Sequence, residues 1–328
     1  MATTTPSAGS SHDEEHNNTE SPKSLVIGWG PASYCQYQGY WLPEKALKSL
    51  KLFQRHFEAH NSDIILATVP RSGTIWLKSL VFAIVNRTRY TFSQHPLLTN
   101  APHQLVPFLE FMVYGNETIP DLTKLEPPRI FGTHVHYPLL PNSIKDSDCK
   151  IVYLCRNPRD NFISLWQFMN KVPNAKPLSL EEAFELYCRG VSLSGPFWDH
   201  VLGFWKASLE NPKKVLFLQY EEMKKDTTCL VKKLAEFLGC PFTQEEESQG
   251  IIDGIVKLCS FDHLKKLDVN NQMTPRYFSR MSSRKILLRK GEVGDWMNYF
   301  TPSMISQLDR IIKEKLHGSG LEFHYSLG

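Results

Sequence analysis

The sequence of 328 residues contains no uninterrupted apolar run of the about 18 residues that a membrane-spanning helix needs. Its formal net charge is only +3, which gives no argument for nucleic acid as a partner but is compatible with a local basic pocket. Its seven cysteines include no CxxC pair, so they fit neither a zinc site nor a disulfide framework. Reduced thiols are typical of a cytoplasmic protein. We therefore expect a cytoplasmic protein that binds neither a membrane nor nucleic acid.

The N-terminal residues also lack the apolar segment of a secretory signal. Residues 1–23 are rich in Ser, Thr, Asn and acids instead, a composition typical of disordered chain. The chain as a whole is 41% hydrophobic and 22% charged, which is ordinary for a globular protein. We expect a disordered tail over 1–23 and a single folded domain over 24–328.

Four short apolar, β-branched segments predict buried parallel strands. The strongest are "DIILATV" (63–69) and "KIVYLC" (150–155), whereas "RIFGT" (129–133) and "KVLFLQY" (214–220) are weaker. A turn and then helical periodicity follow each of the two strongest, over about 74–87 and 160–170. Further helices are expected at about 180–190, 196–210, 227–238, 243–258 and 302–316. This alternation predicts an α/β fold, in which helices cover a parallel sheet.

The first strand is joined to its helix by "VPRSGTIW", residues 69–76. A glycine turn there directs backbone N–H groups and the positive end of the helix at one spot, a geometry that binds phosphate or sulfate. The nucleotide-triphosphate loop would add a lysine and a Mg²⁺-binding hydroxyl after the glycine. Gly73 is followed by Thr74 and Ile75 instead, which disfavours an ATPase or a kinase. A plain structural turn is the alternative.

A second candidate anion site follows the 150–155 strand, where Arg156 is the next residue and Ser164 lies two turns into the following helix. Open α/β sheets bind ligands at this edge, and arginine can grip a phosphate bidentately. Alternatively, Arg156 pairs with Asp160 at the start of the helix. Two anion-suited sites at neighbouring strand ends predict a ligand with two separated anionic groups.

Two further segments carry candidate functional residues. In "THVH" (133–136), His134 follows a strand, and a histidine there is suited to act as a general base because its pKa is near neutrality. A structural role is the alternative, and no third residue with metal-ligand spacing is nearby. In "RKGEVGDW" (289–296), two cations precede Gly291, whose missing side chain would let a ligand approach the backbone; a solvated surface loop is the alternative.

Six motifs in order strongly resemble those of the cytosolic sulfotransferases: "ATVPRSGTIWLK" (67–78), "THVH" (133–136), "YLCRNPRDNFISLW" (153–166), "VLFLQYEEMKKD" (215–226), "LCSF" (258–261) and "RKGEVGDWMNYF" (289–300). Three others resemble the plant branch: "APHQLVPF" (101–108), "YCRGV" (187–191) and "GPFWDH" (195–200). The resemblance runs from about residue 35 to 325. It implies a single α/β domain around a five-stranded parallel sheet, and the sulfonate donor 3′-phosphoadenosine 5′-phosphosulfate (PAPS), with no metal.

The resemblance also implies roles for individual residues. The 5′-phosphosulfate would be cradled by Arg71, Ser72, Gly73, Thr74, Ile75 and Trp76. The 3′-phosphate would be held by Arg156, Ser164, Arg289, Lys290 and Gly291, and the adenine would contact Trp76, Tyr220 and Phe261. His134 falls on the position of the catalytic base, and Arg71 on that of a catalytic lysine.

The opening loop departs from the family's PKSGTTW pattern at two positions, Arg71 for lysine and Ile75 for threonine. Arginine is a wide planar fork rather than a point charge, and isoleucine lacks a hydroxyl, so we expect weakened donor binding and slow turnover. A nucleotide binder without transferase activity is therefore the alternative.

The resemblance implies a small apolar acceptor with a hydroxyl group, such as a hydroxyjasmonate, a brassinosteroid or a flavonol. Residues 103–114 with Phe168 and Met169 could line its pocket, or could be ordinary core. The dimer signature of animal members, KxxxTVxxxE, aligns with Met297, Thr301, Pro302 and Ser306, so three of its residue types are absent and a monomer is expected.

Overall fold

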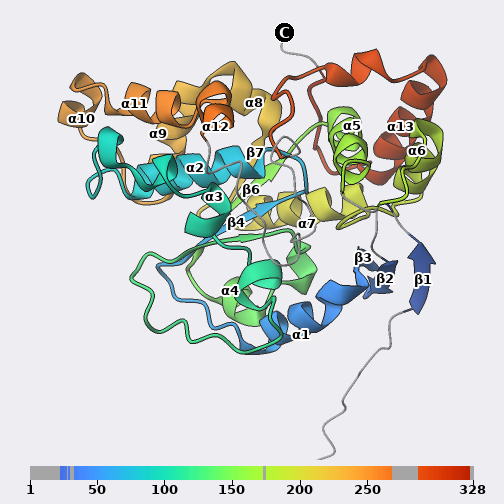
Figure 1. The fold of residues 1–328 in the computed structure, drawn as a ribbon, viewed down its shortest axis with the longest axis horizontal. Coiled ribbons are helices and arrows are strands. Elements are labelled where there is room, and N and C mark those ends of the chain that lie inside the picture. The colour runs from blue at the N-terminus through green and yellow to red at the C-terminus, as the bar shows by residue number, and fades with distance from the viewer. Residues whose placement is uncertain (1–22, 28, 30–32, 173–174, 268–286, 326–328) are drawn as a thin grey trace, which may run out of the picture.

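The structure of the protein, a computed structural model, describes residues 23–27, 29, 33–172, 175–267 and 287–325. The tail predicted over 1–23 lies outside these residues except for Lys23, at which the first strand begins. The described part contains one parallel sheet covered by helices and a small antiparallel sheet (Figure 1). The predicted α/β fold class is therefore confirmed.

The parallel sheet has four strands in the order β5-β4-β6-β7. They are β4 (Ile64–Thr68), β5 (Ile130–Thr133), β6 (Lys150–Cys155) and β7 (Val215–Gln219). All four segments predicted as strands are thus confirmed. The five-stranded sheet that the resemblance implied is wrong by one strand within the described residues. Each of the four apolar segments supplies one strand, and the further pairing of Phe108 with Gly132 is only an isolated bridge.

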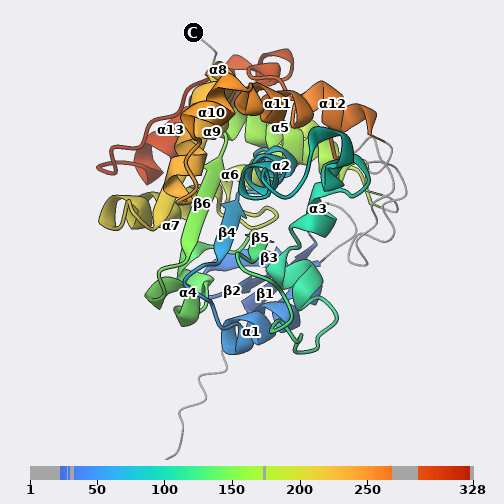
Figure 2. The ribbon, with the colours of Figure 1, turned by 90° about the vertical axis from the view of Figure 1, so that its left-hand side faces the viewer.

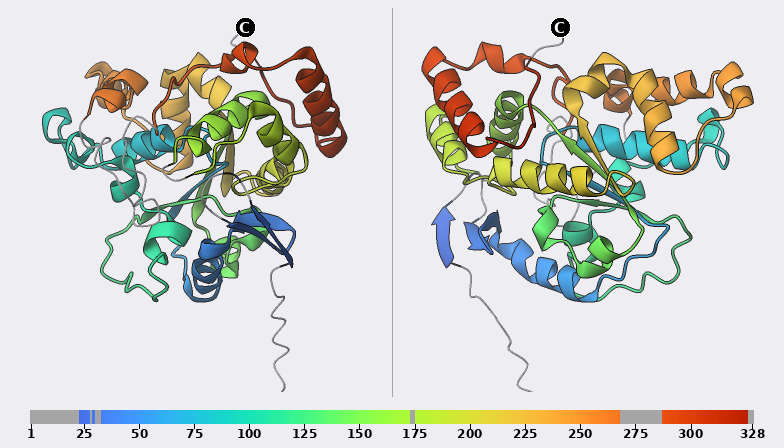
Figure 3. Two further views of the ribbon diagram at one scale, coloured as in Figure 1. Left: turned by 45° about the vertical axis from the view of Figure 1, so that its right-hand side comes forward. Right: turned by 180° about the vertical axis from the view of Figure 1, so that it is seen from behind.

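The remaining strands, β1 (Lys23–Ile27), β2 (Ser33–Tyr37) and β3 (Tyr40–Pro43), pair antiparallel with one another. Gln38 and Gly39 join β2 to β3 and both have positive φ, 50° and 88°. Two positive φ values in a two-residue loop match the tight turn that suits a twisted hairpin. Figure 3 shows this small sheet beside α1 (Leu47–His56), away from α9–α11.

Both faces of the parallel sheet are covered, which explains its continuously apolar strands. In β4, Ile64 and Leu66 pack under α2 (Thr74–Val85), α9 (Thr227–Phe237) and α11 (Ile251–Leu258). Ile65 and Ala67 point to the other face, because side chains alternate along a strand, and pack with α5 (Pro158–Met169), α6 (Leu180–Cys188), α7 (Phe197–Glu210) and α13 (Pro302–Lys315). Figures 1 and 2 show the first group of helices together on one side of the sheet.

Most predicted helices form at about the expected residues: α2, α5, α6, α7, α9 and α13. The single helix predicted over 243–258 is wrong. It is divided into α10 (Gln244–Ser248) and α11, because Gly250 has a φ of 72° and interrupts the helix. Short helices not predicted are α3 (Pro102–Leu105), α4 (Asn142–Asp146), α8 (Tyr220–Lys225), α12 (Phe261–Lys266) and the π-helical turn Leu109–Val113.

The register of the sheet aligns the carboxyl ends of its strands. Thr68 pairs with Leu154, Ala67 with Thr133, and Cys155 with Gln219. The residues that follow these ends therefore meet at one edge. That edge receives the 69–73 loop, His134, Arg156 and Tyr220.

Candidate active site

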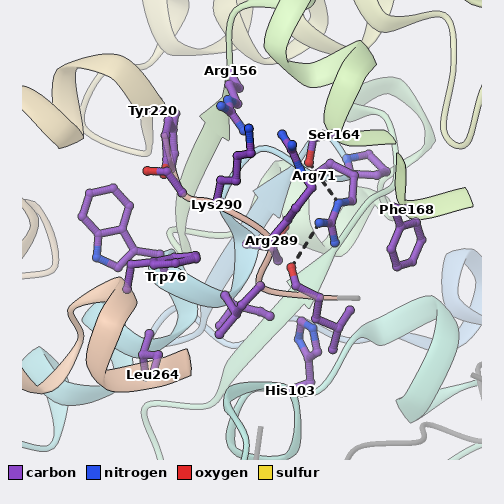
Figure 4. Close-up of a pocket in the computed structure, with 18 of the residues that line it drawn as sticks. Arg71, Trp76, His103, Arg156, Ser164, Phe168, Tyr220, Leu264, Arg289 and Lys290 are labelled. Atoms are coloured by element: carbon purple, nitrogen blue, oxygen red, sulfur yellow. Dashed lines mark hydrogen bonds between the residues drawn. The ribbon is translucent and has the colours of Figure 1, made fainter. Parts of the chain in front are cut away.

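A cavity of about 250 Å³ lies at this edge of the sheet (Figure 4). Nearly all of the residues predicted to hold the donor line it: Arg71, Gly73, Thr74, Ile75, Trp76, Arg156, Ser164, Tyr220, Phe261, Arg289, Lys290 and Gly291. His134 lines it as well. These residues come from six separate parts of the sequence, and folding brings them together around one space.

Ser72 is the predicted residue that does not line the cavity. Its side chain is fully buried, and its oxygen accepts a hydrogen bond from Asn161 Nδ2 at 3.2 Å. Its backbone N–H donates to the Val69 oxygen at 3.2 Å, within the turn. Ser72 therefore fixes the shape of the loop.

The loop ahead of α2 requires glycine at position 73. Gly73 has a φ of 105°, and a Cβ there would lie 2.8 Å from the Tyr220 ring and 3.3 Å from the Leu154 side chain. The helix that begins at Thr74 turns its N-terminus toward the cavity, where its unpaired N–H groups and positive dipole favour an anion.

Three arginines, Arg71, Arg156 and Arg289, crowd the same cavity, with Lys290 beside them. Burial, and then the charges of Arg289 and Arg156, lower the pKa of Arg71 to about 9. Arg71 is still protonated at pH 7, so the lowered pKa measures how unfavourable this arrangement of cations is without an anion. Such a cluster favours an anionic ligand.

Arg71 itself points toward Ser164 and Phe168 (Figure 4). Its Nε lies 3.3 Å from Ser164 Oγ, and one terminal nitrogen donates to the Leu287 oxygen at 3.1 Å. Its guanidinium carbon lies 4.6 Å from the centre of the Phe168 ring. Arg71 thus links the 69–73 loop to α5 and to the start of the segment formed by residues 287–296.

Asp160 anchors that segment from inside α5. Its carboxylate accepts from the backbone N–H of Gly294 at 2.8 Å and of Trp296 at 3.0 Å. It also lies 3.3 Å from an Arg156 nitrogen, so the alternative Arg156–Asp160 pair does form. The pair does not remove Arg156 from the cavity, because the same guanidinium lies 4.8 Å from the centre of the Tyr220 ring.

A second carboxylate, Asp295, holds the two basic residues of the segment. Arg289 lies 2.5 Å from one of its oxygens, and Lys290 pairs with the other. Asp295 is almost fully buried, and these partners with Asn298 hold its pKa below the usual range, although burial acts in the opposite direction. The "RKG" residues are thereby fixed against the cavity.

Aromatic side chains form the neighbouring wall. The rings of Trp76 and Tyr220 are 5.5 Å apart and nearly perpendicular, and Tyr220 donates from its hydroxyl to the Gly291 oxygen at 3.0 Å. A Cβ on Gly291 would lie 2.6 Å from the Phe261 ring, so only glycine fits. These flat apolar surfaces beside the cations are suited to a planar base carrying anionic groups.

His134 lines the same cavity as the cations and has a defined tautomer. Its Nδ1 is 2.8 Å from the Thr68 carbonyl oxygen, which can only accept, so Nδ1 carries the proton and Nε2 has a lone pair. Burial, partly countered by this hydrogen bond and reinforced by Lys78, lowers the pKa of His134 to about 3. His134 is therefore a neutral proton acceptor at pH 7.

Two buried residues near His134 were not singled out by the motifs. Glu110 accepts from the backbone N–H of His134 at 2.7 Å and from Thr133 Oγ1 at 2.9 Å, and burial raises its pKa to about 7. Lys78 is fully buried behind Phe108. The sequence could have drawn attention to Lys78, because it is the one charged residue of the otherwise uncharged helix α2.

The Phe108 and Phe111 rings lie 4.6 and 6.3 Å from the His134 ring. The cavity is also lined by four further apolar side chains: Phe168, Leu193, Leu287 and Leu288. The predicted acceptor-lining run 103–114 thus contributes to the wall, together with Phe168. Met169 does not line the cavity and belongs to the core.

The fold and this geometry define an α/β protein with an anion-binding cavity at the carboxyl edge of its sheet. Residues 61–320 match the family described as Sulfotransferase domain, so the chain belongs to this family of enzymes that transfer sulfonate groups. Cytosolic sulfotransferase 15 of Arabidopsis thaliana is 46% identical over 307 residues, covering 91% of this chain and 84% of the relative. Cytosolic sulfotransferase 1 of the same plant is 48% identical over 322 residues, covering 94% and 96%.

Solved structures agree with this assignment. A putative steroid sulphotransferase of Arabidopsis thaliana has a TM-score of 0.71 and 42% identity, with 92% of each chain covered. A mouse sulfotransferase complexed with PAP has a TM-score of 0.68 and 29% identity, covering 88% of this chain and 96% of its own.

The described residues lack two further features. No helix among them is long and apolar enough to cross a membrane. Among the same residues, no group of three or more His, Cys, Asp or Glu side chains is arranged to hold a metal ion.

Proposed function

We propose that the protein transfers a sulfonate group from PAPS to a hydroxyl of a small apolar acceptor, with His134 as the general base. The observation that carries this proposal is a single cavity lined by a cluster of cations, by a neutral histidine and by apolar side chains. We further propose that the protein is a monomer in the cytoplasm, a location in keeping with the names of its plant relatives.

The donor side of the cavity fits PAPS, whose phosphosulfate and 3′-phosphate are two separated anions. Arg156 and Arg289 each have a buried Nε without a partner among the described residues. A buried unpaired donor is costly, so these atoms favour an anionic ligand. Arg71 and the N-terminus of α2 would hold the 5′ end, and the mouse relative's complex with PAP supports the same use of the site here.

The acceptor side fits a hydroxyl compound. PAPS, when bound, supplies an activated sulfonate group. His134 would take the hydroxyl proton on Nε2, while Glu110 and Thr68 hold its backbone and its ring in place. Arg71 and the N-terminus of α2 would stabilise the negative charge that develops on the donor side, which is the function that a metal ion has in many phosphoryl transferases. We therefore propose that no metal is needed.

A second candidate function, nucleotide binding with little transfer, is favoured by the contacts of Arg71. Its guanidinium is held by Ser164, Leu287 and Phe168, all to one side of the loop, and Ile75 offers no hydroxyl at the cavity. Arg71, the cation that would stabilise the leaving oxygen of the donor, is then partly engaged by these protein contacts.

Incubation with radiolabelled PAPS and a panel of phenols, hydroxysteroids and hydroxyjasmonate, with EDTA present, tests the proposal. We expect transfer to at least one acceptor, and a loss of about 10²–10⁴-fold in His134→Ala because the base is removed. PAPS binding without transfer would favour the second function. Transfer that needs added Mg²⁺, or that persists in His134→Ala, would overturn the mechanism.

A further inference from the structure

A buried histidine and lysine form a pair at the acceptor end of the cavity. His103, in α3, lines the cavity and is 7% exposed. In Figure 4 it lies at the opposite end from Arg156 and Lys290. Its ring is 4.9 Å from Phe108, whose ring is in turn 4.6 Å from His134. His103 is therefore on the acceptor side, one aromatic ring away from the proposed base.

Lys78 holds His103 from behind. Its Nζ donates to the Val106 carbonyl oxygen at 2.8 Å and lies 3.2 Å from His103 Nδ1. The end of the lysine also fills the space over Gly132, where a Cβ would lie 2.5 Å from Lys78 Cε. Backbone on one side and the Phe108 ring on the other leave the amine little freedom.

This contact selects one tautomer of His103. Burial, and then the charge of Lys78, lower the pKa of His103 far below its usual value, so the imidazole is neutral. A neutral imidazole has one donor and one acceptor nitrogen. Burial lowers the pKa of Lys78 as well, but its amine carries N–H groups in either protonation state. With Lys78 as the donor to Nδ1, the ring proton is on Nε2.

Within the described part of the chain, no hydrogen-bond partner faces the donor at Nε2. Within the described residues, the contact with Lys78 is the one hydrogen bond of the His103 side chain. The Nε2 atom is not completely enclosed by protein atoms. His103 thus adds an oriented N–H group to the part of the cavity wall that the Phe108 and Phe111 rings form.

We propose that His103 determines acceptor specificity by donating this hydrogen bond to a carbonyl or carboxylate oxygen of the acceptor, remote from the hydroxyl that is sulfonated. Lys78 is a positioning residue that fixes the tautomer. The inference rests on the proposed use of this end of the cavity for the acceptor. Acceptors without such an oxygen leave a buried donor unpaired, which lowers their kcat/KM.

Matched acceptor pairs test the proposal. One pair is a hydroxysteroid with and without a ketone on its distal ring, and the other is an ω-hydroxy fatty acid and the alcohol with a methyl group in place of its carboxyl. We expect the wild type to favour the oxygen-bearing member of at least one pair by roughly 10- to 100-fold in kcat/KM. A preference within the steroid pair would show that His103 binds a carbonyl oxygen, and a preference within the fatty-acid pair would show that it binds a carboxylate.

Three variants identify the residue responsible. His103→Leu should abolish the preference, whereas His103→Gln, which has an amide N–H at a similar reach, should retain part of it. Lys78→Met should reduce the preference while leaving His103 in place. His60→Leu, at an exposed histidine, is the matched control and should leave the ratio unchanged.

A merely structural role for His103 would lower kcat/KM equally for both members of a pair, and this result would overturn the proposal. So would a wild type without preference for either oxygen. If no acceptor is sulfonated, the proposed function fails. The role of His103 can then still be tested, because the Kd values of the two members of a pair, measured with PAP present, should differ by the same factor. Equal Kd values within both pairs would overturn the role of His103 separately.

Discussion

At the scale of single residues, Arg71 is the position where a change of side chain is most informative. Its φ of 72° is left-handed, but arginine and lysine both carry a Cβ, so exchanging them leaves the backbone strain the same. What differs is the head group. The planar fork of Arg71 bonds Ser164 and Leu287 and stacks on Phe168, whereas a lysine ammonium is a compact charge on a flexible stem.

Arg71→Lys is expected to raise kcat, by roughly 10-fold or more, because a freed ammonium can approach the leaving oxygen and one well-placed donor is worth about 10²–10³-fold. Steady-state kinetics with PAPS and the best acceptor measure this. The companion change Ile75→Thr should instead lower the Kd for PAP, since a new hydroxyl can bond a phosphate. If Arg71→Lys lowers kcat, the arginine is already placed productively and our interpretation of the departure is wrong.

Local sequence patterns predicted the residues near the strand ends, whereas the contribution of Phe261 came from the resemblance. Arg71, His134 and Arg156 were found because a parallel sheet brings its strand ends to one edge. Lys78 and His103 were not recognised as a pair, because they lie 25 residues apart and meet only through packing. The specific roles of all of these residues stay predictions.

At the scale of elements, the basic segment 289–296 is fixed by carboxylates rather than by its own backbone hydrogen bonding. Asp160, fully buried on α5, binds two backbone N–H groups of the segment and pairs with Arg156. The Arg159–Asp309 pair nearby differs in exposure, because the Asp309 side chain is 44% exposed. The two pairs therefore allow a matched comparison.

Asp160→Asn is expected to lower the free energy of unfolding by roughly 3–5 kcal/mol, because it leaves Arg156 buried without its charge partner. Asp309→Asn, the control, should cost less, about 1 kcal/mol, because solvent reaches the Asp309 end of this pair although Arg159 is buried. Denaturant unfolding measures both. Equal costs would show that Asp160 does not anchor the segment, and a weakened PAP affinity in Asp160→Asn alone would support its role at the site.

The elements themselves were predicted unevenly, for physical reasons. The four parallel strands were found because burial on both faces makes them continuously apolar. The β2–β3 hairpin was missed, since its turn is Gln38-Gly39 rather than a typical Asn-Gly. The helical period continues across Gly250, so the break between α10 and α11 depends on backbone conformation that the pattern does not contain.

At the scale of the whole molecule, the most distinctive electrostatic feature is a set of buried histidines with lowered pKa values. Burial lowers the pKa of His200 to about 4 and of His134 to about 3, and it lowers those of His95, His103 and His136 as well. Below pH 6.5 the unfolded chain binds protons that the folded chain excludes, so stability falls as the pH falls. Glu110 acts in the opposite direction between about pH 7 and 4.5, because its folded pKa is raised.

His136→Phe isolates one of these histidines. His136 is 2% exposed, and its ring lies 4.0 Å from Tyr40 and 4.4 Å from His200, so phenylalanine retains the ring packing but cannot be protonated. From pH 6.5 to pH 5, the wild type should lose about 2 kcal/mol more stability than the variant, since one excluded proton contributes about 1.4 kcal/mol per pH unit. Denaturant unfolding at both pH values measures the difference. Parallel pH profiles would mean that His136 accepts a proton in the folded protein, which would require the Tyr40–His200 region to hold a charge that its present packing excludes.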